Sequence, residues 1–257
     1  MKKFLLGATA AIFLAAPAMA ADLPVKAAPP VVAPVAKWTG CYVGGSAGYT
    51  RGRSRTITDN TVFPPNFNNR LLTNDPTLEG AIIGGQGGCD YQFNSFVVGV
   101  SVDGSTTDKN GSERLIAPFN PFYAVDTKEN WLATAQVRLG YTVIPSWLLY
   151  VTGGGAWAGV RQSEYSVLNP NAFQATNTTT ETMSGWVVGV GTEYMWDSHW
   201  SIKGEVLWVD LGTHTFLNPG FLLANAAPVN TRLTEFVARI GVNFRFNLLP
   251  AAVVARY

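Results

Sequence analysis

Charged side chains are scarce in this 257-residue sequence, and histidine and cysteine are scarcer still, with two of each. Lys, Arg, Asp and Glu make up 14% of the chain, whereas they make up about 25% of an average soluble domain. The formal net charge is only +1, so the sequence lacks the strongly basic surface that nucleic-acid binding requires. Its 26 glycines and 12% aromatic residues indicate a surface that meets more than water.

A hydrophobic run long enough for a membrane-spanning helix, about 20 residues, is also missing. The apolar run at residues 4–16 is too short; it follows two lysines and precedes an Ala-Met-Ala triplet that ends at residue 20. This order is typical of a secretory signal peptide, so we expect residues 1–20 to be removed, with Ala21 as the new N-terminus. No later run reaches 18 apolar residues, and a closed β-barrel is then the remaining way to satisfy the backbone within a membrane.

Apolar and polar side chains alternate in the part of the chain after residue 37, most clearly near its end. In residues 236–246 every even-numbered position is apolar, while the odd-numbered positions include Arg239, Asn243 and Arg245. Period two indicates a β-strand with two different faces. A second clear case, residues 130–143, has Leu132 as the one apolar residue on its polar face. Six further segments are similar: residues 38–50, 79–93, 96–104, 147–161, 183–196 and 200–211.

The connections between these eight segments alternate in length. Residues 94–95, 144–146 and 197–199 are tight turns, whereas four long polar connections are expected at residues 51–78, 105–129, 162–182 and 212–231. The sequence therefore predicts an all-β fold, an eight-stranded antiparallel up-and-down transmembrane β-barrel with short periplasmic turns and long extracellular loops. We expect four parts: a signal peptide (1–20), a Pro/Ala-rich periplasmic linker (21–37), the barrel (38–246) and a C-terminal extension (247–257).

All eight tryptophans fall within the proposed strands, most of them near strand ends. This is the position of aromatic rings that anchor a barrel at the two membrane interfaces. A soluble lipocalin-like barrel is the alternative explanation of the alternation, but it does not need so many aromatic residues at strand ends.

With the apolar set facing lipid, eight charged residues face the barrel interior. They are Asp90, Asp103, Arg138, Glu193, Lys203, Glu205, Arg239 and Arg245. Eight strands leave an interior about wide enough for side chains to fill, and buried ions are tolerated only when paired and hydrogen-bonded. We therefore predict a structural plug of ion pairs, with a narrow water-filled path as the alternative.

Three sequence segments resemble a known family. They are WTGCYVGG at residues 38–45, VLWVDLG at 206–212 and VARIGVNFRF at 237–246. With the preceding spacer, which begins Ala-Asp-Leu-Pro, they resemble the outer-membrane immunogenic protein family of alphaproteobacteria, a porin-like β-barrel group. The resemblance implies a Gram-negative outer-membrane barrel that is folded by the barrel-assembly machinery. Family members usually end at the last aromatic of the final strand; here either Phe246 or Tyr257 is the assembly signal, and the periodicity favours Phe246.

The function that this resemblance implies is structural: envelope integrity and interactions at the cell surface. The alternatives are a narrow porin for small hydrophilic solutes, or a surface protein that binds haem or a host molecule through aromatic residues of its loops. His199 and His214 lie at opposite ends of the predicted barrel, so the sequence shows no Ser/His/acid set. We expect no enzyme, no catalytic residues, and no metal or cofactor site.

Two groups of residues are candidates for a disulfide and for a contact with lipid. Cys41 and Cys89 should lie at similar depth on neighbouring strands, which allows a disulfide in the oxidising periplasm; two free thiols are the alternative. Arg51, Arg53 and Arg55 alternate just beyond the first strand, where their guanidinium groups would meet the phosphates of lipopolysaccharide. A solvated loop base is the alternative for these arginines.

The N-terminal linker provides the last candidate site. Mature Ala21 and the proline-rich segment after it resemble the N-terminus by which barrels of this family can be joined covalently to peptidoglycan. A free α-amine on a small residue, carried on an extended arm, suits such a linkage. A disordered leader without this role is the alternative.

Overall fold

The computed structural model describes residues 38–58, 70–117, 122–167, 178–218 and 227–246. The expected signal peptide, linker and C-terminal extension lie outside these ranges. The nine strands are β1 (Gly40–Thr58), β2 (Thr77–Phe93), β3 (Phe96–Thr107), β4 (Asn110–Arg114), β5 (Tyr123–Ile144), β6 (Trp147–Ser166), β7 (Thr178–Met195), β8 (Trp200–Asn218) and β9 (Ala227–Phe246). No helix in the described ranges is long and apolar enough to cross a bilayer.

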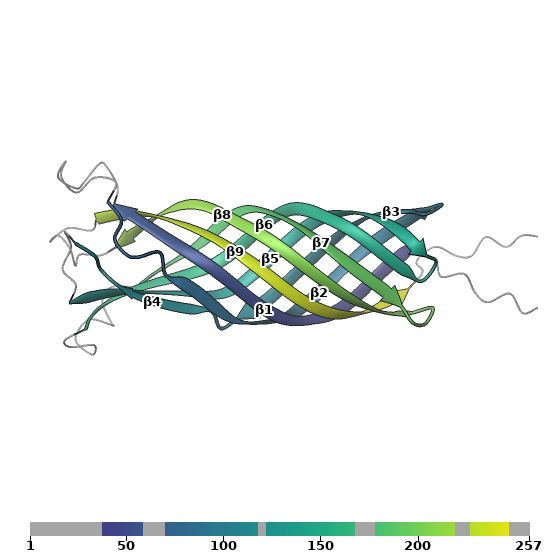
Figure 1. Cartoon of the computed structure of the whole chain (residues 1–257), viewed down its shortest axis with the longest axis horizontal. Helices are drawn as coiled ribbons and strands as arrows, with labels where there is room; N and C mark the ends of the chain where they lie inside the picture. Colours follow the sequence, from purple (N-terminus) through teal and green to yellow (C-terminus); the bar gives the residue numbers. More distant parts are fainter. Residues whose placement is uncertain (1–37, 59–69, 118–121, 168–177, 219–226, 247–257) are drawn as a thin grey trace, which may run out of the picture. The chain divides into compact units, whose positions relative to one another are not determined.

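Eight of these strands close into a ring. The hydrogen-bonded order is β1-β9-β8-β7-β6-β5-β3-β2, and β2 pairs back to β1. Each neighbouring pair is antiparallel, and Figure 1 shows the strands winding around the barrel at a common tilt. The short β4 follows β3 after a break at residues 108–109 and pairs with β5. The predicted all-β, eight-stranded antiparallel barrel is confirmed.

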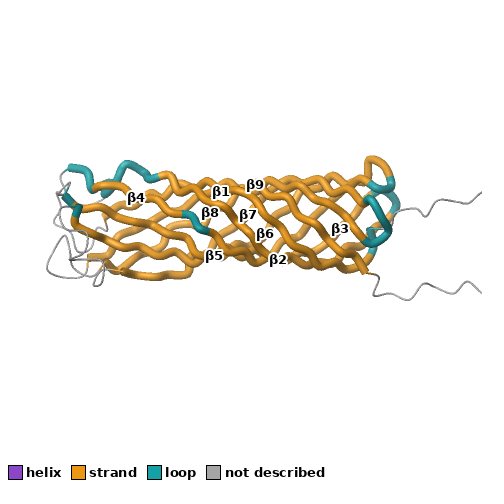
Figure 2. The backbone as a smooth tube through the Cα atoms, turned by 90° about the horizontal axis from the view of Figure 1, so that it is seen from below, coloured by secondary structure: helices purple, strands orange, loops and turns teal. Residues whose placement is uncertain are grey.

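The two ends of the barrel differ, as Figure 2 shows. Tight turns join β2 to β3, β5 to β6 and β7 to β8. At the opposite end the strands continue further than the sequence predicted: β1 runs to Thr58, and β9 begins at Ala227. The expected loops at 51–78, 105–129, 162–182 and 212–231 were therefore too long. Outward side chains in this region are polar, so the apolar-out pattern of a lipid-facing strand ends there although the backbone ladder continues.

The outward surface carries an apolar belt between two bands of exposed aromatic rings. We call the band toward the long connections the outer girdle; it comprises Tyr49, Trp131, Trp157, Trp186, Trp208 and Phe236. The inner girdle, toward the tight turns, comprises Tyr91, Phe93, Phe96, Tyr141, Trp147, Tyr194, Trp196, Trp200 and Phe244. Valine, isoleucine, leucine and small residues fill the surface between them. This is the surface that a lipid bilayer requires of a barrel.

Candidate functional site: the barrel interior

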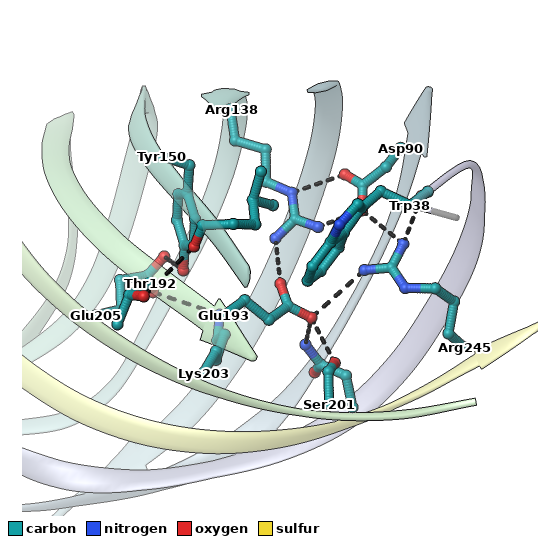
Figure 3. A network of polar contacts seen from close by, with 12 residues as sticks. Trp38, Asp90, Arg138, Tyr150, Thr192, Glu193, Ser201, Lys203, Glu205 and Arg245 are labelled. Carbon is teal, nitrogen blue, oxygen red and sulfur yellow. Dashed lines mark hydrogen bonds and ion pairs between the residues drawn. The ribbon is translucent and has the colours of Figure 1, made fainter. Parts of the chain in front are cut away.

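The first group of inward charges lies near the inner girdle. Arg138 on β5 donates to Asp90 Oδ1 (2.7 Å) and to Glu193 Oε2 (2.9 Å). Arg245 on β9 donates to Asp90 Oδ2 (2.8 Å) and lies 3.4 Å from Glu193 Oε1. Ser201 also donates to Glu193 Oε1 at 2.5 Å. Figure 3 shows dashed lines from Glu193 to both guanidinium groups and from both to Asp90, so two arginines and two carboxylates form one neutral cluster.

The second group lies further along the lumen, toward the outer girdle. Arg239 approaches Asp103 Oδ1 at 2.8 Å and Glu205 Oε2 at 2.6 Å. Lys203 Nζ is 3.4 Å from Glu205 Oε2, and the Tyr150 hydroxyl donates to Glu205 Oε1 at 3.1 Å. All eight sequence-predicted lumen residues are thus buried, and the structure divides them into two clusters of two acids and two bases each.

Trp38 does not lie in a girdle, contrary to the expectation that tryptophans anchor the barrel in the membrane. Its side chain is fully buried in the periplasmic mouth of the lumen. The indole N–H donates to the Pro145 carbonyl (3.0 Å), and the Trp38 carbonyl accepts from Arg245 (2.8 Å). The Arg245 guanidinium lies 5.0 Å from the ring centroid, within cation–π distance. A signal was present in the sequence: Trp38 shares the parity of Tyr42, which also faces inward.

Two tyrosines restrict the arginines further. The Arg138 guanidinium lies 4.8 Å from the Tyr42 ring and 5.2 Å from the Tyr150 ring. Arg245 lies 5.1 Å from the Tyr42 ring. The rings remove water from around the guanidinium groups, which strengthens their attraction to the carboxylates.

Above the two ionic clusters the lumen is apolar, a feature that the sequence did not predict. This apolar layer comprises Leu132, Ala156, Ala158, Met183, Val187, Leu207, Val209, Leu211 and Val237, each with 0 to 1% of its surface exposed. The only sign of this layer in the sequence was Leu132, the one apolar residue on the polar face of its strand. These nine side chains offer no hydrogen bonds to water or ions, although two buried hydroxyl residues, Ser105 opposite Leu132 and Thr50 opposite Val237, lie beside them.

A third charged cluster, which the sequence did not predict, adjoins the outer side of the apolar layer, where Glu235 stands opposite Val209. Lys109 Nζ contacts Glu129 Oε2 at 2.8 Å and also binds Glu235 Oε2, and all three side chains have no exposed surface. Thr50 donates to Glu235 at 3.1 Å. The sequence did not predict that Lys109 faces inward, because it occupies the break between β3 and β4. It did not predict an inward Glu129 either, because a register shift between Glu129 and Trp131 changes the inward positions of β5 from odd-numbered to even-numbered residues.

Residues 70–72 lie beside the extracellular end of β1, and we refer to their buried residue Leu72 as the cap. Leu72 is fully buried; its N–H donates to the Thr56 carbonyl (3.0 Å), and its own carbonyl accepts from Ile116 (2.9 Å). The Leu72 side chain belongs to the apolar cluster that also contains Leu115 and Phe216. Buried side chains therefore extend from the periplasmic mouth to this cap.

The outward candidate residues have separate surroundings. Cys41 stands directly opposite Cys89 in the β1–β2 register, and their sulfur atoms are bonded. Arg51 forms an ion pair with Glu79 at 3.0 Å, whereas Arg53 and Arg55 are exposed beyond it on the same face of β1. Ala21, the proposed site of peptidoglycan attachment, lies outside the described residues.

Replacing both cysteines by serine is expected to lower the free energy of unfolding by about 2–4 kcal/mol, because the bond closes a long loop in the unfolded chain. The bond also fixes the register of two glycine-rich strands, whose register is otherwise weakly specified. Urea unfolding in detergent, followed by the heat-modifiable gel mobility of the barrel, measures the change. An equally stable double variant, or two titratable thiols in the oxidised wild-type protein, would contradict it.

Each histidine has a serine nearby, but neither arrangement is a catalytic triad. Ser198 Oγ lies 2.8 Å from His199 Nδ1, and the Asp197 carboxylate accepts from Ser198 rather than from the imidazole. All three residues are exposed in the turn between β7 and β8. His214 Nε2 hydrogen-bonds, within the described ranges, to backbone atoms of Ser184, its N at 3.2 Å and its O at 3.3 Å. A triad requires the acid to orient the histidine, and this turn does not provide that geometry.

Comparison with known proteins gives consistent matches over almost the whole chain. The family model described as outer membrane protein beta-barrel domain matches residues 6–246. A 31 kDa outer-membrane immunogenic protein of Brucella melitensis biotype 1 is 31% identical over 251 residues, which cover 96% of this chain and 100% of the relative. A protein of the same name from Brucella suis biovar 1 gives the same values. Among solved structures, the outer membrane protein OprG of Pseudomonas aeruginosa matches with a TM-score of 0.50 and 13% identity, covering 81% of this chain and 97% of that chain.

Proposed function

Because this chain belongs to the outer-membrane β-barrel domain family and lies in the outer membrane of a Gram-negative bacterium, we propose that it is a closed structural barrel. In this proposal it contributes to envelope integrity and displays its loops at the cell surface. The observation that carries the proposal is the filled lumen, in which ionic, apolar and ionic layers follow one another beneath the Leu72 cap.

The order of the layers supports a closed state better than a porin. Charged rings alone can line a water-filled channel, as they do in wider barrels. Here the arginines and carboxylates hydrogen-bond to one another, and only Asp103 Oδ2, Arg239 Nη1 and Arg245 Nε of the two described clusters lack a partner. The apolar layer beyond them, with Leu207 and Val237 fully buried, would impose a large desolvation penalty on any ion that crosses it.

Planar-bilayer recording of the purified protein tests this proposal. We expect no stable openings in symmetrical potassium chloride, because an ion would have to break the paired clusters and then enter the apolar layer. A variant with Leu132→Ala, Met183→Ala and Leu207→Ala serves as the comparison, since it empties the apolar layer and keeps the ionic clusters. Steady wild-type openings whose conductance rises with salt would assign the narrow-porin function instead.

A second part of the proposal is attachment of the N-terminal segment to peptidoglycan. Trp38 supports it, because the residue at which this segment joins the barrel is held by Pro145, Gln92 and Arg245. Such an anchorage would transmit a load from the cell wall to three different parts of the ring.

Mass spectrometry of muramidase-digested sacculi tests the attachment. The expected product is Ala21 in amide linkage to a stem peptide, formed by a cell-wall enzyme that uses the free α-amine exposed by signal cleavage. A variant that lacks residues 24–36 should fold as a barrel and yield less of this product. Recovery of every N-terminal peptide with a free amine would exclude the attachment and leave the closed-barrel proposal standing.

The proposal also includes contact between the exposed arginines of β1 and lipopolysaccharide, and it includes no enzymatic activity. The turn at His199 lacks an acid that orients the imidazole, which favours a non-enzymatic barrel. Binding of haem or of a host molecule by loop aromatics is the alternative to this surface role.

A further inference from the structure

Two arginines face each other across neighbouring strands on the outer surface. In the β1–β9 register Arg55 stands directly opposite Arg232, and both are exposed. Arg53 lies two residues before Arg55 on the same outward face of β1, opposite Thr234. Like charges directly opposite one another destabilise a sheet. Negative charge nearby would therefore stabilise three outward guanidinium groups in this arrangement.

The acidic residues of the described chain supply only part of that charge. Arg51 is already paired with Glu79 at 3.0 Å, and Arg232 binds Asp210 Oδ2 at 2.6 Å. Neither Arg53 nor Arg55 has an ion-pair partner among the described residues. Asp210 therefore pairs with only one of the three arginines, and Arg53 and Arg55 have no counter-charge among the described residues.

The site lies just beyond the outer girdle. Phe236 and Trp208, two girdle residues, stand opposite each other, and Phe236 also stands opposite Arg51. Arg55 is four residues further along β1, about 14 Å at 3.4 Å per residue, which is roughly 10 Å in height for a strand tilted by about 40°. The guanidinium groups therefore lie in the layer that the outer-leaflet headgroups occupy.

We propose that Arg53, Arg55 and Arg232 form a phosphate-binding site for a phosphate group of the outer-leaflet glycolipid. This inference rests on the proposed contact with lipopolysaccharide; it names the chemistry of that contact and replaces Arg51 by Arg232. The planar fork of arginine binds phosphate oxygens in bidentate fashion. A phosphate between Arg55 and Arg232 would satisfy both forks and relieve their mutual repulsion.

The melting temperature of the barrel in detergent micelles, with and without added lipid A, tests this site. Gel mobility reports the folded fraction. Lipid A that carries its phosphates is expected to stabilise the wild-type protein, and phosphatase-treated lipid A is not. In Arg55→Gln/Arg232→Gln the affinity for phosphorylated lipid A should fall roughly a hundredfold, since each of the two lost charge-assisted contacts costs about one decade. Arg55→Gln alone keeps the Arg232–Asp210 pair and should show a smaller loss in the same direction.

The matched control is Arg70→Gln/Arg114→Gln, which removes the same charge from exposed positions outside the site. Its response should equal that of the wild type. An equal response of the Arg55 variants and the control would overturn the site, even if the wild-type protein carries lipopolysaccharide through purification. Equal stabilisation by inorganic phosphate alone would overturn the glycolipid as the ligand. Neither result bears on the closed lumen, which bilayer recording tests separately.

Discussion

Glu193→Lys is expected to destabilise the barrel by about 3–5 kcal/mol, the cost of breaking a buried ion pair and leaving its partners uncompensated. Glu193 accepts from Arg138 (2.9 Å), Ser201 (2.5 Å) and Asn243 (3.0 Å), and it also faces Arg245. A lysine in its place would put three cations around Asp90 in a space closed by Trp38. The temperature at which the folded gel band disappears, together with urea unfolding in detergent, measures the loss.

Glu181→Lys is the matched control for this prediction, because it makes the same charge change at an exposed position on the same strand. Its effect should stay within about 0.5 kcal/mol. Glu193→Gln should lie between the two, since it keeps the side-chain shape but leaves one arginine charge without its counter-ion. If Glu193→Lys melts at the wild-type temperature, the lumen is hydrated at this level and the ion-pair plug is wrong.

Lys109→Met should be as damaging, although Lys109 lies at the other end of the lumen. Its ammonium is the buried cation that contacts both Glu129 and Glu235. Removing it leaves two carboxylates facing each other with no exposed surface, and breaking a buried pair in this way costs about 3–5 kcal/mol. We expect a large fall in the free energy of unfolding, or loss of the folded band at pH 7.

The triple variant Lys109→Met/Glu129→Gln/Glu235→Gln provides the discriminating control. Replacing a whole buried ionic group by neutral residues of similar size is often close to neutral in stability, so the triple variant should regain most of the lost stability. A single Lys109→Met variant with wild-type stability would show that the cluster is not dry. A triple variant as unstable as the single one would mean that Lys109 acts through packing of the break between β3 and β4.

The strand pattern is the part of the fold that the sequence predicted well. Residues 236–246 alternate because one face meets lipid and the other meets the lumen, and the structure exposes Phe236 and Ile240 while burying Arg239 and Arg245. The tight turn at residues 94–95 was also predictable, and Asn94 adopts the positive φ (53°) that such turns demand. These features depend on residues that are close together in the sequence, so the sequence alone predicts them.

Contacts between strands far apart in sequence were not predictable in the same way. Lys109 points inward only because the chain breaks between β3 and β4, and Glu129 does so only because a register shift precedes Trp131. Arg232 joins Arg55 because β9 closes the ring onto β1. A shift of one residue in any of these ladders would have turned each side chain to the other face.

The sequence by itself determined export, the β-barrel class, the lipid-facing surface and the eight inward charges, because each follows from composition or from period-two alternation within one strand. Only the tertiary structure decided that those charges form two neutral clusters, that Trp38 fills the periplasmic mouth and that an apolar layer crosses the lumen. These features depend on which inward side chains reach the same height after the ring closes. That height is set by the stagger of all eight strands together, so the sequence of one strand does not determine it.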